Sequence, residues 1–143
     1  MAHESGEEFR VESELDPSVA ILKIFPAISE EVVRGAISSP KLKGIVLETY
    51  GSGNTMKFDW FIDCLEEEIK KGKIILNVSQ CIGGEVEQGR YATSKKLNEI
   101  GVLSGGDITT EAALTKMMFL LGSEPNIEVL KSKLTLSLAG EMD

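Results

Sequence analysis

Short apolar runs rich in β-branched residues alternate along this chain with segments whose apolar residues recur every three or four positions. The short runs predict strands, and the periodic segments predict amphipathic helices. We expect strands over residues 19–25, 44–50, 73–78 and 102–103. We expect helices from Ser29, over the stripe Phe58, Phe61, Ile62, Leu65 and Ile69, over 91–100, and from Asp107 or Thr109 to a stop at Gly122.

Capping residues mark the ends of several predicted elements. Ser29 precedes two glutamates, whose charges suit the first turn of a helix. Pro26 ends the first strand, and Gly72 suits a left-handed helix end. We expect Asn54 or Thr55 to cap the helix that follows the second strand.

The last segment fits two periodicities. Residues Ile127, Leu130, Leu134 and Leu138 have helical spacing, whereas Leu134, Leu136 and Leu138 alternate as in a strand. The length of the segment and a start at Pro125 favour the helix.

The alternation of strands and helices predicts an α/β fold, with a small open parallel sheet of about four strands flanked by helices. Ligands of such sheets bind outside the carboxyl ends of the strands. Three segments rich in glycine and small polar residues follow predicted strands: ETYGSGNT at 48–55, NVSQCIGG at 77–84 and LSGGDIT at 103–109. Because glycine lets a backbone come close to a ligand or a neighbouring chain, we expect the functional site at this edge.

The charge of the chain is concentrated at its start. The 143 residues have a net charge of −8, and the first 16 residues hold six acidic side chains and one basic side chain. We expect residues 1–17 to be an acidic interdomain linker and residues 18–143 to form one α/β domain. Nucleic-acid binding needs a basic face, so no nucleic-acid partner is expected.

Apolar runs and cysteines indicate the compartment. No run approaches the ~20 apolar residues of a membrane helix, and the first ten residues lack a hydrophobic signal stretch. No membrane partner is therefore expected. Two cysteines, Cys64 and Cys81, are too few for a disulfide framework. We expect a reduced, cytoplasmic protein.

Complete sets of catalytic residues are missing from the sequence. The loop at 51–54 lacks the lysine of a Walker loop, and Met56 stands where a dinucleotide fingerprint needs its third glycine. The single histidine, His3, lies in the acidic start, so no histidine-activated nucleophile is expected. We expect Cys81 to be a small half-buried residue and Cys64 to be a core residue.

Polar residues later in the chain have ordinary explanations. Asp107 and Thr109 suit a helix cap, and Glu111 with Lys116 suits a solvated pair. No cluster with metal-ligand spacing occurs, so neither a metal nor another cofactor is predicted.

Several longer motifs occur together and in one order. They are KGIVLETYGSGNT at 43–55, ILNVSQCIGGEVEQGRYATSKKLNEIGVLSGGDITTEAALTK at 75–116, and LAGE at 138–141. From about residue 18 to residue 141, the chain closely resembles the C-terminal domain of cytoplasmic (type I) bacterial L-asparaginase. ESGEEF at 4–9 resembles the family's segment between its two domains.

This resemblance implies part of an enzyme that hydrolyses L-asparagine to L-aspartate and ammonia. Family members carry their nucleophilic threonine in a TGGT-type loop and a Thr-Asp pair in a DGTD-type loop of the N-terminal domain. Neither motif occurs in this sequence. No catalytic residue is therefore expected in this chain, and an N-terminal asparaginase domain is its expected partner.

The resemblance also implies which residues support the site. Family active sites form between the N-terminal domain of one subunit and the C-terminal domain of its neighbour, so a homo-oligomer is expected. Tyr50, Gly51, Gly53 and Asn54 match the YGxGN loop, whose asparagine supports the neighbouring site. An amide side chain both donates and accepts hydrogen bonds, so it can hold a substrate-binding residue in place.

Some type I enzymes also have an effector site for asparagine near these strand ends. Glu48 and Cys81 are the candidate residues for such a site here. Glu48 replaces a basic residue found in some members, and a glutamate would repel the carboxylate of the ligand.

Three functions fit the sequence. The chain is the C-terminal part of an asparaginase that is inactive without the missing domain, or a free-standing module that binds a small amino acid or supports assembly, or part of an asparaginase-related amidotransferase. Turnover of asparagine by the purified chain would refute the first, and calorimetric titration with asparagine, aspartate and glutamine tests the second.

Overall fold

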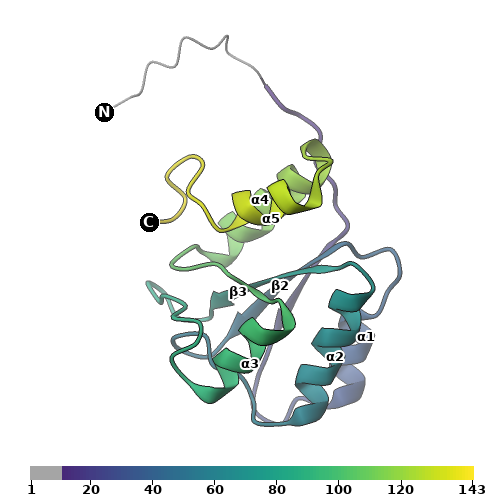
Figure 1. Ribbon diagram of the computed structural model, residues 1–143, viewed down its shortest axis with the longest axis vertical. Helices are drawn as coiled ribbons and strands as arrows, with labels where there is room; N and C mark the ends of the chain where they lie inside the picture. The colour runs from purple at the N-terminus through teal and green to yellow at the C-terminus, as the bar shows by residue number, and fades with distance from the viewer. Residues whose placement is uncertain (1–10) are drawn as a thin grey trace.

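The computed structural model describes residues 11–143, which are built around a four-stranded parallel sheet (Figure 1). The strands lie in the order β1-β2-β3-β4. Their bounds are Val19–Lys23 for β1, Gly44–Thr49 for β2, Ile74–Ser79 for β3 and Leu103–Ser104 for β4. The predicted α/β fold with a small parallel sheet is confirmed. His3 and the first part of the predicted linker lie outside the described residues.

Helices cover both faces of this sheet (Figure 1). Their bounds are Glu30–Ile37 for α1, Asp59–Lys70 for α2, Ala92–Ile100 for α3, Thr110–Ser123 for α4 and Ile127–Leu134 for α5. Helices α1, α2 and α3 pack on one face, and α4 with α5 packs on the other. The predicted final helix is confirmed, although Leu136 and Leu138 lie beyond its end.

The alternation of side chains along the strands divides the interior into two cores. In β2, Ile45 and Leu47 join the core formed with α1, α2 and α3, whereas Val46 joins the core formed with α4 and α5. In β3, Ile75 joins the core formed with α1, α2 and α3, and Leu76 joins the core formed with α4 and α5. Since both faces are covered, both sets of side chains are buried, and the central strands therefore have nearly continuous apolar sequences.

Two predicted helix caps are confirmed and one is wrong. Ser29 Oγ accepts from the Val32 N–H at 3.3 Å, and Thr109 Oγ1 accepts from Ala112 N–H at 3.2 Å. Neither Asn54 nor Thr55 caps α2, which begins at Asp59 after Phe58. The backbone of Asn54 is occupied in a turn with Tyr50, so the helix begins several residues later.

All four strands differ from their predicted bounds by one or two residues, and the second and third are Gly44–Thr49 and Ile74–Ser79 rather than 44–50 and 73–78. The first strand ends at Lys23 rather than at residue 25, because the chain turns at Phe25 and the Ile28 N–H donates to its carbonyl at 3.1 Å. The fourth strand is Leu103–Ser104 rather than 102–103. The first and fourth strands lie at the edges of the sheet, where few ladder bonds define the ends.

Lys116 is buried rather than solvated. Its ammonium lies 2.6 Å from Glu141 Oε1, which makes the expected pairing with Glu111 wrong. Burial opposes ionisation of the Glu141 carboxyl, but hydrogen bonds from Lys116 and from the Leu138 and Ala139 N–H groups outweigh it and lower the pKa to about 2. Lys116 thus anchors the C-terminal segment to α4.

Residues 14–18 lie along α4. The Asp16 N–H donates to Met118 O at 3.0 Å, and a hydrogen bond from Lys43 lowers the pKa of the Asp16 carboxyl to about 2. A Cβ at Gly122 would lie 2.5 Å from Glu14 O. Gly122 is therefore needed for this close approach and lies inside α4, not at the stop predicted for it.

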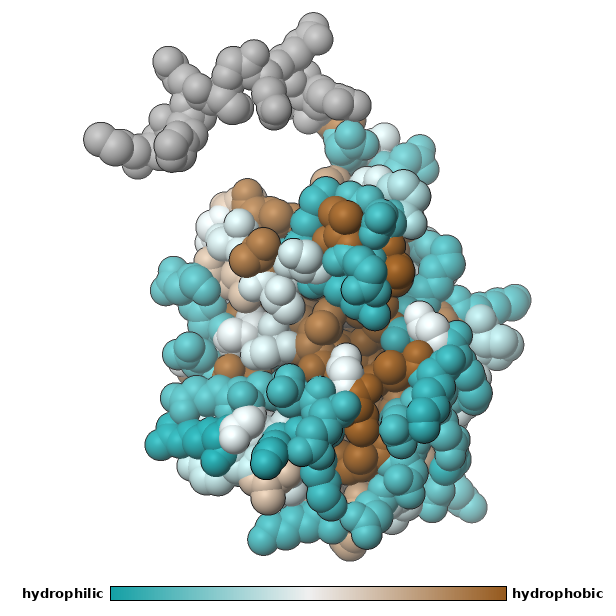
Figure 2. Space-filling view, viewed as in Figure 1, coloured by the Kyte–Doolittle hydropathy of each residue, from teal (hydrophilic) through white to brown (hydrophobic). Residues whose placement is uncertain are grey.

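Hydrophobic side chains also reach the surface. They gather over α5 and the C-terminal segment and along a band between α2 and α3 (Figure 2). Exposed examples in the C-terminal region are Ile127, Val129, Leu136 and Leu138. Of the helices in residues 11–143, none combines the length and the apolar character that crossing a membrane requires.

Candidate functional site

The carboxyl edge of the sheet brings the three predicted glycine-rich segments together. They follow β2, β3 and β4, as expected. Gly105 N–H donates to Asn77 O at 2.8 Å, and Gln80 N–H donates to Thr49 O at 2.9 Å. The segments are therefore in direct contact at one edge.

A tight turn joins Tyr50 to Asn54. The Tyr50 N–H donates to Asn54 O at 2.8 Å, and the Asn54 N–H donates to Tyr50 O at 2.9 Å. Gly51 and Gly53 have φ angles of +48° and +100°, which glycine adopts without strain. A Cβ at Gly53 would also lie 2.8 Å from Val86 Cγ1. Position 53 therefore requires glycine for its backbone angle and for its packing.

Polar side chains near the end of β3 hold this turn. Asn77 is fully buried, donates from Nδ2 to Gly53 O at 3.3 Å, and accepts at Oδ1 from Thr49 Oγ1 at 2.5 Å. Ser79 Oγ donates to Gly51 O at 2.5 Å. The sheet itself thus sets the position of the turn.

The side chain of Asn54 lies beside the first turn of α3. Thr93 Oγ1 donates to Asn54 Oδ1 at 3.2 Å. Both residues line a cavity of about 350 Å³. The other residues that line it are Thr55, Lys57, Tyr91 and Ala92. Asn54 is therefore placed where it can meet a group from outside this chain.

Tyr50 contributes through its backbone and its ring. The ring packs against the core shared by α1, α2 and α3. The hydroxyl is buried and has no hydrogen-bond partner within residues 11–143. Tyr50 therefore supports the turn from inside and does not present its hydroxyl at the surface.

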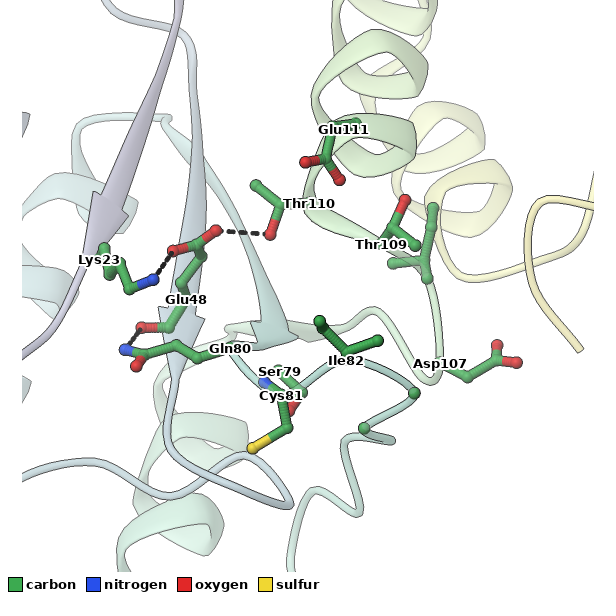
Figure 3. A pocket seen from close by; sticks show the side chains of 13 residues that line it. Lys23, Glu48, Ser79, Gln80, Cys81, Ile82, Asp107, Thr109, Thr110 and Glu111 are labelled. Atoms are coloured by element: carbon green, nitrogen blue, oxygen red, sulfur yellow. Dashed lines mark hydrogen bonds and ion pairs between the residues drawn. The ribbon is translucent and has the colours of Figure 1, made fainter.

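Glu48 and Cys81 line a second cavity, on the α4 side of the edge (Figure 3). Its volume is about 430 Å³, and Lys23 and residues 79–84 and 107–111 complete its lining. Glu48 Oε1 accepts from Thr110 Oγ1 at 2.6 Å, and its Oε2 lies 3.8 Å from Lys23 Nζ. The structure brings both candidate residues to one cavity, but the Cys81 sulfur points away from the Glu48 carboxylate (Figure 3).

Cys81 is exposed, so the expectation of a half-buried residue is wrong. The side chain of Gln80 is tied to the sheet, since its Nε2 donates to Glu48 O at 2.9 Å, and the chain leaves the sheet after it. Cys64 is a core residue as predicted, and burial raises the pKa of its thiol.

Sequence reasoning misses Asn77 and Thr93, which hold the predicted site. An amide inside an otherwise apolar strand is a usable signal for Asn77, because buried polar groups need hydrogen-bond partners. Thr93 has no comparable signal, since it lies 39 positions from Asn54 and the two meet only in the fold. Within the part of the chain that the structure describes, no group of three His, Cys, Asp or Glu side chains could hold a metal ion.

Comparison with known proteins identifies relatives of this domain. Residues 18–133 match the model of the Glutaminase/Asparaginase C-terminal domain family. The chain is 36% identical over 124 residues to L-asparaginase 1 of Escherichia coli K12, a match that covers 87% of this chain and 36% of that protein. It is 33% identical over 138 residues to a Glutamyl-tRNA(Gln) amidotransferase chain of Pyrococcus abyssi, a match that covers 96% of this chain and 31% of that protein.

The structural comparison agrees. L-asparaginase I from Vibrio cholerae superposes with a TM-score of 0.88 at 35% identity, over 96% of this chain and 41% of that one. The chain thus spans less than half the length of these relatives. The resemblance seen in the sequence is confirmed, and the chain belongs to the glutaminase/asparaginase C-terminal domain family.

Proposed function

We propose that this chain is the C-terminal domain of an L-asparaginase and that its Asn54 face completes an active site whose catalytic groups come from an N-terminal domain. The observation that carries the proposal is the turn at 50–54. Asn77 and Ser79 fix its backbone, and its Asn54 side chain lines a surface cavity. A polar group held this way can orient a substrate-binding residue without taking part in bond breaking.

The reaction in this proposal is hydrolysis of the side-chain amide of L-asparagine to L-aspartate and ammonia. The nucleophile belongs to the N-terminal domain, because this sequence lacks the family's threonine motifs. This chain supplies rigid hydrogen-bonding groups at the boundary. Such positioning matters, since a misplacement of about 1 Å can lower a rate by about 10²-fold.

The same proposal defines the partners of the chain. Residues 18–143 form the domain, and residues 1–17 link it to the N-terminal domain, with Glu14 and Asp16 lying against α4. A homo-oligomer places the Asn54 face beside the catalytic domain of a neighbour. The exposed apolar side chains over α5 support association. The turn is shaped by Tyr50, Gly51 and Gly53. The proposed compartment of the protein is the cytoplasm.

Ammonia release tests this proposal. The purified chain with asparagine should release no ammonia above background, and the complete enzyme that contains the chain should release it readily. In the complete enzyme, Asn54→Ala should lower kcat/KM about tenfold or more, because a hydrogen bond at the site is lost. Asn98→Ala, an exposed change on α3, is the matched control and should have no effect. Turnover by the chain alone would contradict the proposal.

The cavity beside Glu48 and Cys81 supports a second, regulatory role. We propose it as the position of an effector, because residues from β1, β2, the 79–84 loop and α4 meet there. The start of α4 is where a carboxylate of the ligand would bind. The Glu48 carboxylate already accepts a hydrogen bond from Thr110 at this position. Asparagine should therefore bind weakly.

Calorimetric titration checks this role. Glu48→Gln should bind asparagine more tightly than the unaltered chain, since like-charge repulsion is removed. Protection of the exposed Cys81 thiol from alkylation reports binding at this cavity, and buried Cys64 is the internal control. Weaker asparagine binding by Glu48→Gln would contradict the proposed repulsion.

The amidotransferase relative supports one alternative, in which the chain serves an amide-transfer enzyme. Substrate choice separates the two: the asparaginase proposal expects asparagine to be hydrolysed faster than glutamine by the complete enzyme. Binding of amino acids by the isolated chain, with no effect of Asn54→Ala on any turnover, would favour a free-standing binding module.

A further inference from the structure

The polar groups of Asn54 are unequally occupied. Its backbone N–H and carbonyl both bond to Tyr50, and its side-chain Oδ1 accepts from Thr93 Oγ1 at 3.2 Å. Within residues 11–143, its Nδ2 has no hydrogen-bond partner. One of the two lone pairs of Oδ1 is therefore occupied, whereas both Nδ2 protons are available.

The residue that occupies the acceptor is itself firmly held. Thr93 lies in the first turn of α3. The neighbouring Ser94 is fully buried, and its Oγ accepts from Tyr91 N–H at 3.1 Å and from Gly89 N–H at 3.2 Å. Ser94 Oγ also donates to Tyr91 O at 2.9 Å. These bonds fix the start of α3, and with it the position of the Thr93 hydroxyl.

An asparagine amide has nearly the same shape in two orientations that exchange its oxygen and its nitrogen. A hydroxyl can in principle serve either orientation. Here the Thr93 hydroxyl donates to Oδ1, which leaves Nδ2 toward the surroundings. The same cavity is also lined by Lys57, whose ammonium has only donors. The Lys57 side chain is exposed and forms no ion pair within the described residues.

We infer that Thr93 is a positioning residue that sets the Asn54 amide as a hydrogen-bond donor, so that the group recognised at this face is an acceptor, a carboxylate or carbonyl oxygen. This inference rests on the proposed function and specifies the partner chemistry of the same site. It assigns the two Nδ2 protons of Asn54 to that acceptor, while Oδ1 keeps one lone pair beyond its bond to Thr93.

Kinetics of the complete enzyme that contains this chain test the inference. Thr93→Val removes the hydroxyl at nearly constant shape and should lower kcat/KM about tenfold, the size of one hydrogen bond. Thr93→Ser restores the hydroxyl and should restore most of the activity. Thr115→Val, the same change at an exposed threonine of α4, is the matched control and should leave kcat and KM unchanged.

A double variant separates positioning from a general structural role. In the Asn54→Ala background, Thr93→Val should cause no further loss, because its effect passes through the Asn54 amide. Equal losses in both backgrounds, or failure of Thr93→Ser to recover, would overturn the inference. If Asn54→Ala itself has no effect, the proposed function of this face fails, whatever Thr93 does.

Nuclear magnetic resonance on the chain tests, without any turnover, whether Thr93 holds the Asn54 amide in place. The order parameter of the Asn54 side-chain nitrogen should be high in the unaltered chain and in Thr93→Ser. It should fall below about 0.6, the range of flexible groups, in Thr93→Val. An unchanged order parameter in Thr93→Val would show that another contact holds the amide, and would overturn the inference.

Discussion

The two sides of the carboxyl edge of the sheet carry different chemistry, although they begin at adjacent residues of β2. Thr49 points toward the α3 side and bonds to buried Asn77, whereas Glu48 points toward the α4 side and bonds to Thr110. Successive side chains of a strand face opposite ways, so a one-residue step separates the two surfaces.

The two sides also differ in how they are held. On the α3 side, buried side chains and two positive-φ glycines fix the turn at 50–54. On the α4 side, the loop at 81–84 turns into solvent, with Cys81 and Ile82 exposed. Under the proposed function, the rigid Asn54 side suits a fixed partner, and the exposed loop on the Glu48 side suits a ligand.

The largest expected effect is at Gly53. Gly53→Ala should lower the free energy of unfolding by about 2–4 kcal/mol, because the new Cβ forces strained backbone and meets Val86. Gly51→Ala has open space at its Cβ and should cost about 1 kcal/mol. Urea unfolding followed by circular dichroism measures both. Equal losses at the two glycines would show that packing around Gly53 does not hold the turn.

The next effect is at Asn77. Asn77→Ala leaves Gly53 O without its partner and removes the nearer of the two acceptors of the Thr49 hydroxyl, which should lower the free energy of unfolding by about 2–3 kcal/mol. The exposed Asn98→Ala should change it by less than about 0.5 kcal/mol. Urea unfolding followed by circular dichroism measures the free energy of unfolding of both variants. A loss as small as that of the control would mean that the turn does not depend on the sheet.

A smaller effect belongs to the α4 side. Thr110→Val removes the donor to Glu48 and should lower the free energy of unfolding by about 1 kcal/mol. Thr115→Val on the same helix is the control, and its unfolding should be nearly unaltered. Nitrogen–proton spectra should show the Asn54 amide unchanged in Thr110→Val. A shift of that amide would mean that the two sides are coupled.

The smallest effect is expected at Tyr50. Its buried hydroxyl has no partner among the described residues, so Tyr50→Phe should leave the free energy of unfolding unchanged or raise it by up to about 1 kcal/mol. Thermal unfolding against the exposed Tyr91→Phe provides the comparison. A clear loss of stability in Tyr50→Phe would reveal a hydrogen bond to the hydroxyl.

Much of the fold follows from local pattern. The period of the apolar residues predicts every strand and helix of residues 19–134 to within a few positions, and it predicts which segments meet at the edge. Ser29 and Thr109 are correct caps because capping involves residues three positions apart. The YGxGN turn is also visible in the sequence, since the positive-φ positions need glycine.

The tertiary structure decided the contacts between distant residues. Lys116 meets Glu141 instead of Glu111, Gly122 meets Glu14 instead of ending its helix, and Thr93 meets Asn54. Each of these depends on how helices pack on the sheet, which local periodicity does not encode. The sequence alone therefore determined the elements and the edge where function is expected, and packing decided which polar atoms at that edge remain free to bind.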